Sequence, residues 1–277
     1  MTRLKTLDVA DIGANLDRYD TELLVKTGYT LQGLACRTAG VEENIVRDLI
    51  ASTKVGVIPM TCGQGVISGF TETVQQITAH LGFNAFVTRL TDVSGLAEAF
   101  NKKSDLIILS DDDRFVAVNV KSRRVVDNAD ATGKGYTTGL NLMTGGLRAK
   151  KVLVIGCGSV GRSSAIGLIR LGAAVSVYDI QRARCDQLAR EMKDLMDAEI
   201  RIEKDLNSAL TRYRCIIDAS PAANFINEGH ITGDTYISAP GMPSGLSPGA
   251  RSKIADRFLH DPLQIGAATM VVEAVKE

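Results

Sequence analysis

A glycine-rich segment in the second half of the chain constrains the fold more than any other feature. The run Lys151–Ile155 is short, apolar and typical of a buried strand, and it leads directly into Gly156-Cys157-Gly158-Ser159-Val160-Gly161. In a strand–loop–helix unit, glycines at this spacing allow a tight turn, close approach of the backbone to a pyrophosphate, and close packing of helix on strand. The helix that follows is expected to reach Leu171, and its first N–H groups would face phosphate oxygens.

The next predicted strand, residues 174–178, ends on the acidic residue Asp179. A carboxylate at this place accepts hydrogen bonds from an adenosine ribose and repels a 2′-phosphate. Glycine-rich turns alone are common, but here strand, glycines, helix, second strand and acid occur in order. The sequence therefore predicts a Rossmann unit with NAD as the cofactor, bound by Gly156, Gly158, Ser159, Val160, Gly161 and Asp179.

Two later strand ends complete the predicted cofactor site. Residues 215–218 and 236–238 have the pattern of strands, and they are followed by Ser220-Pro221 and by Ala239-Pro240. Strand ends of this kind flank the bound dinucleotide in Rossmann units, so we expect all four residues beside the nicotinamide ribose. Ordinary turn formation by proline and glycine explains the same sequences, and both interpretations stay open.

The whole chain predicts an α/β protein with two lobes. Residues 1–50 show apolar residues at helical spacing, and short strands alternate with helices from there on. Such alternation predicts parallel, doubly wound sheets. We expect an N-terminal helical plus α/β substrate-binding lobe over residues 1–147, joined by a C-terminal helix over residues 263–277. A Rossmann NAD-binding lobe is expected over residues 148–262.

Individual elements follow from the same patterning. Polar, glycine-containing residues 127–135 predict a connector, and a helix over residues 137–147 is expected to lead into the second lobe. Predicted elements of the first lobe are strands at 55–60, 83–89, 106–109 and 115–119 and helices at 72–81 and 93–102. Predicted strands of the second lobe lie at 152–155, 175–178, 200–202, 215–218 and 236–238.

Composition excludes several classes of function. The 277 residues include 32 basic and 32 acidic side chains, which leaves no basic excess to neutralise nucleic-acid phosphates. No apolar run suits a membrane span, and residues 1–20 lack the apolar core of a signal peptide. The five cysteines and three histidines are scattered, so no metal site is expected. These features predict a cytoplasmic protein with a small-molecule substrate and without a nucleic-acid or membrane partner.

Two loops at the ends of first-lobe strands are candidates for substrate binding. Thr61-Cys62-Gly63-Gln64-Gly65 lies between a predicted strand and helix, where a substrate carboxylate could bind, although a simple turn explains it equally well. Asp111-Asp112-Asp113-Arg114 follows a buried strand, and its carboxylates suit a cationic substrate, an amine above all. The alternative is a solvated turn with one aspartate as a cap and another paired with Arg114.

Several segments resemble the pyrrolysine synthase family, NAD-dependent dehydrogenases that complete pyrrolysine biosynthesis. The glycine-rich loop with Asp179 is the generic part of this resemblance, whereas Thr91-Asp-Val-Ser-Gly95 and Asp112-Asp113-Arg114 are specific. The matching order runs nearly from end to end of the chain. The other matching segments are residues 55–59, 61–65, 132–133, 240–243 and 261–266.

The resemblance implies a substrate made of lysine joined through its side-chain amine to 3-methyl-D-ornithine. It also implies an N-terminal lobe whose short first helix closes over the site, with Leu4 as a closing residue on that helix. The implied substrate contacts are Thr61, Cys62, Gly63, Gln64 and Asp112, of which Asp112 is the catalytic candidate. The family pattern has Ser and Asn where Cys62 and Gln64 stand.

The implied reaction oxidises the terminal amine-bearing carbon of the substrate, with loss of ammonia and ring closure. Asp112 would orient the substrate ammonium, and a water would accept its proton. The alternatives are another amine or amino-acid dehydrogenase, a shikimate-type enzyme, and a non-catalytic NAD-binding sensor. A shikimate-type enzyme should carry a Lys–Asp pair at the substrate hydroxyl, which the sequence pattern does not reveal. The sequence leaves open whether the protein is a monomer or a homodimer.

Overall fold

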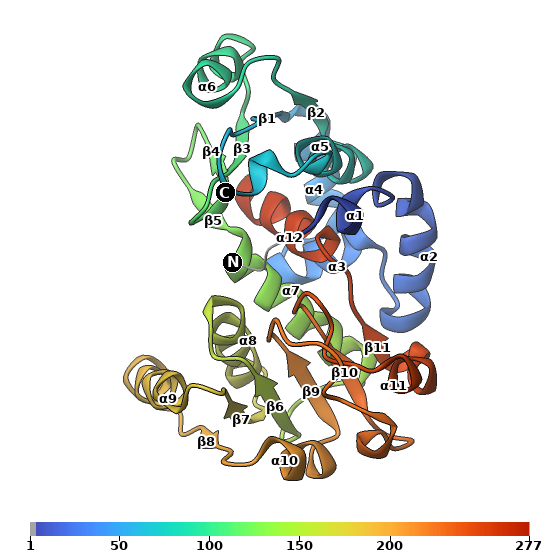
Figure 1. Cartoon of the computed structure of the whole chain (residues 1–277). Helices are drawn as coiled ribbons and strands as arrows, with labels where there is room; N and C mark the ends of the chain where they lie inside the picture. Colours follow the sequence, from blue (N-terminus) through green and yellow to red (C-terminus); the bar gives the residue numbers. More distant parts are fainter. Residues whose placement is uncertain (1–3, 277) are drawn as a thin grey trace. The chain divides into compact units, whose positions relative to one another are not determined.

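The structure, a computed structural model, describes residues 4–276, apart from the side-chain surroundings at positions 51, 64 and 65. These residues divide into two units, each with a sheet of its own (Figure 1). Unit 1 runs to Gly135 and includes the C-terminal residues from Pro262 onwards, whereas unit 2 runs from Tyr136 to Asp261. The predicted α/β class, with a helical beginning and a Rossmann part, is confirmed.

Unit 1 begins with helices, as the apolar spacing of its first fifty residues predicts. They are α1 (Thr6–Val9), η1 (Gly13–Asn15), α2 (Leu16–Thr27), α3 (Leu31–Ala39) and α4 (Glu43–Ser52). The ends of α2 and α3 are set by Gly28 and Gly40, which adopt the left-handed conformation that glycine tolerates best. Thr30 caps the start of α3, because its hydroxyl oxygen accepts a hydrogen bond from Gly33 N–H.

The sheet of unit 1 is mixed, so the prediction of a parallel sheet is wrong for part of it. Its strands are β1 (Lys54–Val57), β2 (Asn84–Val87), β3 (Leu106–Ser110), β4 (Phe115–Asn119) and β5 (Val125–Asp127), in the order β2-β1-β3-β4-β5. β1 is parallel to β2 and β3, but β4 runs antiparallel to both β3 and β5. The connections before and after β4 are too short for a crossover, and short connections join only antiparallel strands.

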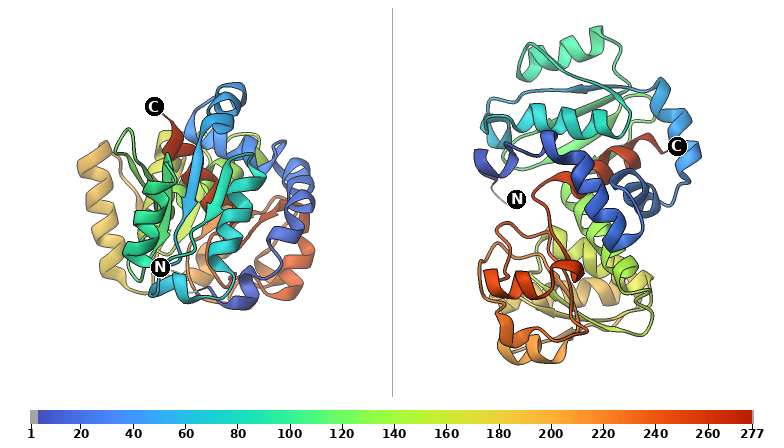
Figure 2. Two further views of the ribbon diagram at one scale, coloured as in Figure 1. Left: turned by 90° about the horizontal axis from the view of Figure 1, so that it is seen from above. Right: turned by 90° about the vertical axis from the view of Figure 1, so that its right-hand side faces the viewer.

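Helices cover both faces of this sheet. α5 (Phe70–His80) and α12 (Gln264–Val275) lie on one face, and α12 is buried along its whole length against α3, α5, β4 and β5 (Figure 2). α6 (Asp92–Asn101) lies on the other face, where Ala99 packs with Ile58 and Ile107. The helices predicted near these three segments therefore form.

Unit 2 has six parallel strands in the order of a complete Rossmann sheet. They are β6 (Lys151–Ile155), β7 (Ala174–Tyr178), β8 (Arg201–Ile202), β9 (Cys215–Asp218), β10 (Tyr236–Ser238) and β11 (Phe258–Leu259), ordered β11-β10-β9-β6-β7-β8. The sequence pattern does not predict β11, because two residues show no alternation. The order of the strands reverses between β6 and β9, and in such sheets ligands bind at the carboxyl ends of the strands at that point.

One helix replaces the connector predicted at residues 127–135. α7 (Asn128–Met143) begins directly after β5, where Asp127 Oδ1 accepts a hydrogen bond from Ala129 N–H. Gly135 does not interrupt it, because that helix position is tightly packed: a Cβ atom there would lie 2.5 Å from Ile265 Cγ2 of α12. The prediction of a non-helical connector is therefore wrong, since packing overrides the low helix propensity of glycine.

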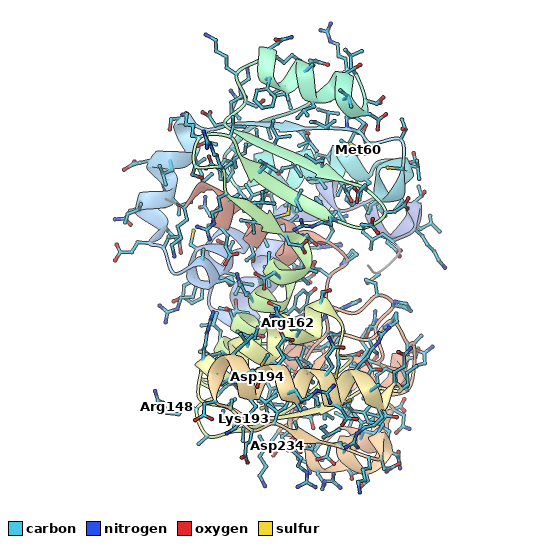
Figure 3. The ribbon with its side chains drawn as sticks, turned by 90° about the vertical axis from the view of Figure 1, so that its left-hand side faces the viewer. Met60, Arg148, Arg162, Lys193, Asp194 and Asp234 are labelled. Carbon is cyan, nitrogen blue, oxygen red and sulfur yellow. The ribbon has the colours of Figure 1, made fainter. Side chains whose placement is uncertain are left out.

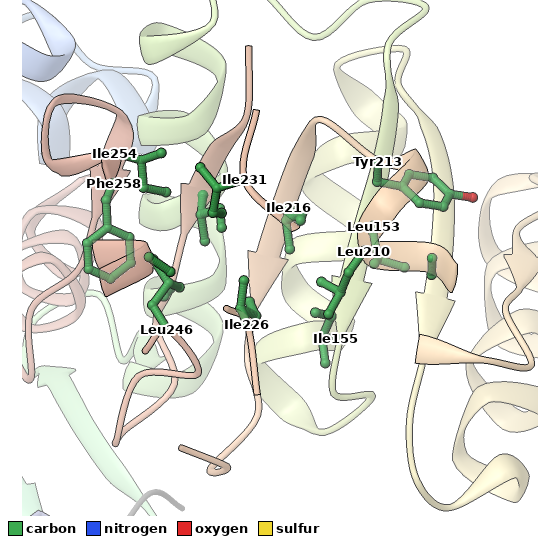
Figure 4. Packing of buried hydrophobic residues seen from close by; sticks show 14 residues of the cluster. Leu153, Ile155, Leu210, Tyr213, Ile216, Ile226, Ile231, Leu246, Ile254 and Phe258 are labelled. Atoms are coloured by element: carbon green, nitrogen blue, oxygen red, sulfur yellow. The ribbon is translucent and has the colours of Figure 1, made fainter. Parts of the chain in front are cut away.

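The core of unit 2 surrounds its sheet. On one side, Leu153, Ile155 and Ile216 pack with the residues around α10 (Leu206–Arg212) and α11 (Pro248–Lys253) (Figure 4). On the other side, strand residues pack against α8 (Ser159–Arg170) and α9 (Arg182–Met196). Apolar cover on both faces explains why these strands are continuous apolar runs in the sequence.

Candidate functional site

The glycine-rich loop of unit 2 approaches its neighbours so closely that two of its glycines cannot be replaced. Gly156 has a φ of +91°, and a Cβ atom there would lie 2.8 Å from the carbonyl oxygen of Ala219. At Gly161 a Cβ atom would overlap the carbonyl oxygen of Gly156. The predicted packing of helix on strand is therefore present, and these contacts fix the path of the loop.

Gly158 differs from these two glycines, because a Cβ atom there would meet nothing within 4 Å. It is the N-cap of α8, which continues with Ser159, Val160 and Gly161, and among the described residues no side chain caps this helix. The helix end therefore offers free N–H donors and the positive end of its dipole to open space. An anionic group such as a pyrophosphate fits this arrangement.

Asp179 stands beside the loop in a fixed orientation. Its Oδ2 accepts a hydrogen bond of 2.8 Å from Cys157 N–H, and its Oδ1 accepts one of 2.8 Å from Gln181 N–H. Each carboxylate oxygen has a second lone pair, so both can accept further bonds from hydroxyl groups. The contact with Cys157 ties the end of β7 to the glycine-rich loop at the end of β6.

The segments that follow β9 and β10 also meet at the carboxyl ends of the strands, on the side of the sheet where the glycine-rich loop lies. Gly241 N–H donates to the carbonyl oxygen of Asp218, and Ala239 N–H donates to that of Leu259. Ala239 and Pro240 are buried, Ser220 is half-buried, and Pro221 is exposed. Because Gly156 lies against Ala219, the structure brings the predicted residues of both strand ends to the carboxyl edge of β6.

A buried carboxylate, which the sequence pattern does not single out, holds these segments together. Asp218 is fully buried; its Oδ1 accepts bonds from the N–H and the hydroxyl of Ser220, and its Oδ2 accepts one from Gly245 N–H. Burial raises the pKa of Asp218 to about 6, although the donors at Ser220 and Gly245 oppose this shift. An aspartate as the last residue of a buried strand is the only sequence signal for it.

In unit 1, the two predicted substrate loops lie against each other. Gly63 has a φ of +59°, and a Cβ atom there would overlap the backbone between Asp111 and Asp112. Both loops follow parallel strands, β1 and β3, so their close approach is a consequence of the pairing of these strands. The side chain of Gln64 lies outside the described residues, and that of Cys62 is exposed.

Asp92 fixes the first of these loops. Its Oδ1 accepts a 2.9 Å hydrogen bond from Thr61 N–H, and its Oδ2 accepts one of 2.8 Å from the Thr61 hydroxyl. These two bonds lower the pKa of the Asp92 carboxyl, with the backbone bond as the larger cause. The Thr61 hydroxyl group therefore uses its one proton in the hydrogen bond to Asp92. The Thr91–Gly95 segment stands out in the sequence, but only the fold shows its contact with Thr61.

The acidic loop partly follows the solvated-turn alternative. Asp111 Oδ1 accepts bonds from the N–H groups of Asp113 and Arg114, so Asp111 shapes the turn. Arg114 pairs with Asp127 at 3.2 Å and not with an aspartate of its own loop. Within residues 4–276, Asp112 and Asp113 form no ion pair, and both side chains are exposed. Their carboxylates are thus available to a cation.

Leu4 precedes the first helix, so its expected place on that helix is wrong. α1 begins at Thr6 after the extended residue Lys5, whose N–H donates to Asp8 Oδ2 at 2.7 Å. This bond caps the N-terminus of α1 at Lys5, so the helix begins after Leu4 and does not include it. Leu4 itself is buried, and the segment that follows reaches α5, where the Thr73 hydroxyl donates to the carbonyl oxygen of Val9.

A lysine–aspartate pair is present that the sequence pattern does not reveal. Lys134 on α7 lies 2.6 Å from Asp130 Oδ2, and its Nζ also lies 3.1 Å from both carboxylate oxygens of the buried Glu273 on α12. The pKa of Lys134 is raised: burial opposes this shift, but the two carboxylates outweigh it. The spacing of four residues on one helix is the signal that could have indicated the pair.

Neither a metal site nor a membrane span is evident in residues 4–276. The described histidine, cysteine and acidic side chains include no group of three or more arranged to hold a metal ion. None of the described helices is both long and apolar enough to cross a membrane.

Known proteins resemble the chain over nearly its whole length. The family model described as "Pyrrolysine biosynthesis protein PylD, N-terminal domain" matches residues 8–126, and that described as "Alanine dehydrogenase/PNT, C-terminal domain" matches residues 125–226. The chain is 30% identical to pyrrolysine synthase of Methanosarcina acetivorans, with 98% of both chains covered. It is 29% identical to pyrrolysine synthase of Methanosarcina barkeri, with 98% of this chain and 97% of that protein covered.

A solved structure with the same fold is the quinate dehydrogenase from Corynebacterium glutamicum in complex with NAD. The TM-score is 0.55, and the match covers 81% of this chain and 93% of that chain. The sequences are only 14% identical, so the likeness concerns the fold alone.

The raised pKa of Asp218 predicts a pH-dependent contribution to folding. Because this carboxyl titrates near pH 6 in the folded chain and near 3.9 in water, the folded state binds more protons between these values. Stability from this group is therefore lost as the pH rises through that window. We expect the free energy of unfolding of the wild type minus that of Asp218→Asn to fall by about 2 kcal/mol between about pH 4 and pH 7.

Urea denaturation across this range measures the difference. Asp194→Asn, which changes an exposed aspartate of α9, serves as the matched control for the loss of a carboxyl group. A wild-type minus Asp218→Asn difference that does not vary with pH, or that varies no more than the difference for the control, would contradict the assignment of this titration to Asp218.

Proposed function

Because this chain belongs to the pyrrolysine synthase family, we propose that it is an NAD-dependent dehydrogenase that converts lysine-Nε-3-methyl-D-ornithine to pyrrolysine. The full-length similarity to pyrrolysine synthases is the observation that carries this proposal. The free helix end and the oriented carboxylate in unit 2, together with the exposed carboxylates in unit 1, provide what the two ligands would need.

The cofactor would be held by the residues at the carboxyl edge of the unit 2 sheet. Gly158 and the first N–H groups of α8, at Ser159, Val160 and Gly161, would bind the pyrophosphate, because nothing fills the space there. Gly156, through the tight turn that it allows, would keep the loop clear of the pyrophosphate. Ser220, Pro221, Ala239 and Pro240 would border the nicotinamide ribose. NAD supplies an acceptor for hydride when it is bound.

Asp179 would select NAD over NADP. Its carboxylate, held by two backbone N–H groups, would accept hydrogen bonds from the ribose hydroxyl groups. It would repel a 2′-phosphate at the same place. Because the backbone bonds fix the carboxylate, it cannot turn away to accommodate a phosphate without losing them.

We expect the wild type to have a higher kcat/KM for NAD than for NADP, and Asp179→Ala to reduce this ratio at least about tenfold. The ratio is the informative quantity, because disturbance of the loop through Cys157 affects both cofactors alike. Asp194→Ala removes an exposed carboxylate of the same unit and should leave the ratio unchanged. Equal use of both cofactors by the wild type would refute the proposal for Asp179.

The substrate would bind to the two adjoining loops of unit 1. Asp112 would hold and orient the terminal ammonium group, since its carboxylate is exposed and is not used by the turn. The loop of Thr61, Cys62, Gly63 and Gln64 would contact the rest of the substrate, and Leu4 would help to close the site. A thiol at position 62 is a weaker hydrogen-bond donor than the hydroxyl of the family pattern.

The reaction would begin when the terminal amine loses a proton to water. At pH 7 this step costs about 4–5 kcal/mol for a group with a reference pKa of about 10.4. The carbon that bears the amine would then give up a hydride, for which bound NAD would be the acceptor, and would become the carbon of an imine. The α-amine of the ornithine part, four bonds away, attacks this carbon and closes a five-membered ring, and ammonia leaves. The short chain between amine and imine makes this closure fast.

The two exposed aspartates of the acidic loop provide a matched test. Asp112→Asn should lower kcat/KM at least about tenfold, because it removes the charge that orients the ammonium, whereas Asp113→Asn should have little effect. Asp111→Asn is unsuitable as a control, since Asp111 Oδ1 accepts two backbone bonds that shape the turn. Steady-state kinetics of both variants is the measurement, and equal activities would favour a merely solvated turn.

A shikimate-type dehydrogenase is the second candidate, because the Lys134–Asp130 pair supplies the lysine and aspartate that such an enzyme should have. The contact with Glu273 argues against it: two carboxylates raise the pKa of Lys134 and so keep it protonated, which leaves no basic amine at neutral pH. Turnover of shikimate or quinate would favour this candidate.

The products test the proposed function directly. The purified protein with NAD and lysine-Nε-3-methyl-D-ornithine should yield NADH, ammonia and the cyclic imine, and mass spectrometry of the quenched mixture detects the ring. Oxidation without the ring would retain a dehydrogenase and reject the coupled closure. Tight NADH binding without any oxidation would favour an NAD-binding sensor.

A further inference from the structure

Two cysteines that are 28 positions apart in the sequence meet beside the glycine-rich loop of unit 2. Cys157 lies in the loop, between Gly156 and Gly158, and Cys185 lies in the first turn of α9. Their sulfur atoms are 3.6 Å apart, and both thiols are free. The cysteine pattern of the sequence does not indicate this pair, because only the packing of α9 beside β6 brings the two thiols into contact.

The helix α9 fixes one member of the pair. Its buried face carries Cys185, Leu188 and Met192 in the core of unit 2, whereas Lys193 and Asp194 lie on its exposed side (Figure 3). A disulfide bond is about 2.05 Å long, so the two sulfur atoms would have to approach each other by about 1.5 Å. Because Cys185 is held in the core, the approach falls to the loop residue.

The loop residue is also the one that an oxidant can reach. Cys157 is half-buried, whereas Cys185 is only 1% exposed. An oxidant from solution therefore meets Cys157 first, and the thiol of Cys185 stands next to it as the group that completes the reaction. A half-buried thiol with a second thiol in contact is the arrangement found in reversible redox sites.

We propose that Cys157 and Cys185 form a reversible disulfide that weakens cofactor binding under oxidising conditions. The oxidant is a small disulfide such as oxidised glutathione. The thiolate of Cys157 attacks one of its sulfur atoms and displaces one thiol, and the thiolate of Cys185 then attacks the Cys157 sulfur and displaces the second. The two cysteines lose two electrons and two protons together, and the small disulfide becomes two thiols.

Asp179 connects this disulfide to the cofactor site, because it contacts both cysteines. Its Oδ2 accepts the 2.8 Å hydrogen bond from Cys157 N–H, and its backbone N–H donates to the sulfur of Cys185. Movement of Cys157 toward α9 displaces its N–H from Asp179, so the carboxylate loses one of the two bonds that orient it. The disulfide follows from contacts within unit 2 alone, whereas its effect on the cofactor rests on the proposed function.

Both thiols react slowly at neutral pH, since burial raises the pKa of each. The negative charge of Asp179 adds to this effect at both sulfur atoms. Arg184 opposes the shift at Cys157. Arg182 opposes it at Cys185. Because the thiolate is the attacking form, the rate of disulfide formation should rise about tenfold per pH unit between about pH 7 and pH 9.

Peptide mapping tests the disulfide. The full chain is treated with oxidised glutathione at about pH 8.5, alkylated, and digested with trypsin without reduction. Trypsin leaves the two cysteines on separate peptides, residues 152–162 and 185–190, which mass spectrometry should find joined. Cys185→Ala should stop at glutathione bound to Cys157. Cys36→Ala removes a buried thiol of unit 1 and, as the matched control, should form the joined peptides as the wild type does.

NADH binding by the two redox states tests the effect on the cofactor. The dissociation constant, measured by NADH fluorescence, should be at least about tenfold higher for the oxidised than for the reduced wild type, and dithiothreitol should restore the lower value. Cys62→Ala, which lacks the exposed cysteine, should show the same increase, so glutathione bound at Cys62 cannot explain it.

Two results would overturn the proposal: no joined peptides from the oxidised wild type, or equal affinity of its two redox states for NADH. Failure of the reduced protein to bind NADH would instead contradict the proposed cofactor. The joined peptides, which are measured without the cofactor, would then still decide whether the disulfide forms.

Discussion

The backbone of the glycine-rich loop touches its neighbours at distances that exclude any side chain. Gly161 in the first turn of α8 lies against the carbonyl group of Gly156, and Gly156 lies against Ala219 after β9. These contacts fix helix, strand and neighbouring strand end with respect to one another. They also leave the N–H groups of α8 open at Gly158, so the same constraint that packs unit 2 leaves a helix end into which an anionic group would fit.

Buried polar groups also join separate segments within each unit. In unit 2, the buried Asp218 joins the segment after β9 to the loop that ends at Gly245. In unit 1, the buried Glu273 on α12 holds Lys134 on α7. A buried carboxylate is costly unless it is fully hydrogen-bonded or paired, and each of these has a donor on a distant segment, Gly245 for Asp218 and Lys134 for Glu273. The cost of burial is thereby offset by bonds that join distant segments of the same unit.

The two candidate substrate loops depend on strand pairing in the same way. Gly63 and the backbone at Asp111 can touch because β1 and β3 are parallel neighbours whose carboxyl ends share one edge. Asp92, which follows β2 on the other side of β1, holds Thr61 from there. Three segments far apart in the sequence thus form one surface, and only Asp112 and Asp113 of its acidic turn point free carboxylates to solvent.

The sequence by itself determined what depends on neighbours along the chain. The strand, glycines and helix from Lys151 to Arg170, the acid at the end of β7 and the helical beginning of unit 1 are local patterns, because turn geometry, periodicity and helix ends involve residues only a few positions apart. The family resemblance followed from such segments in order. The glycine spacing needed no knowledge of the rest of the fold.

Only the tertiary structure decided the features that depend on contacts between distant segments. The unbroken α7 and the bond from Thr61 to Asp92 have no local signature, and the bond from Gly245 to the carboxylate of Asp218 joins segments that are far apart in the sequence. Gly135 inside α7 indicates a break by propensity alone, and the packing of Ile265 overrides it. Distant packing and hydrogen bonding outweigh local preference at such positions, because they contribute more free energy than the propensity of a single residue.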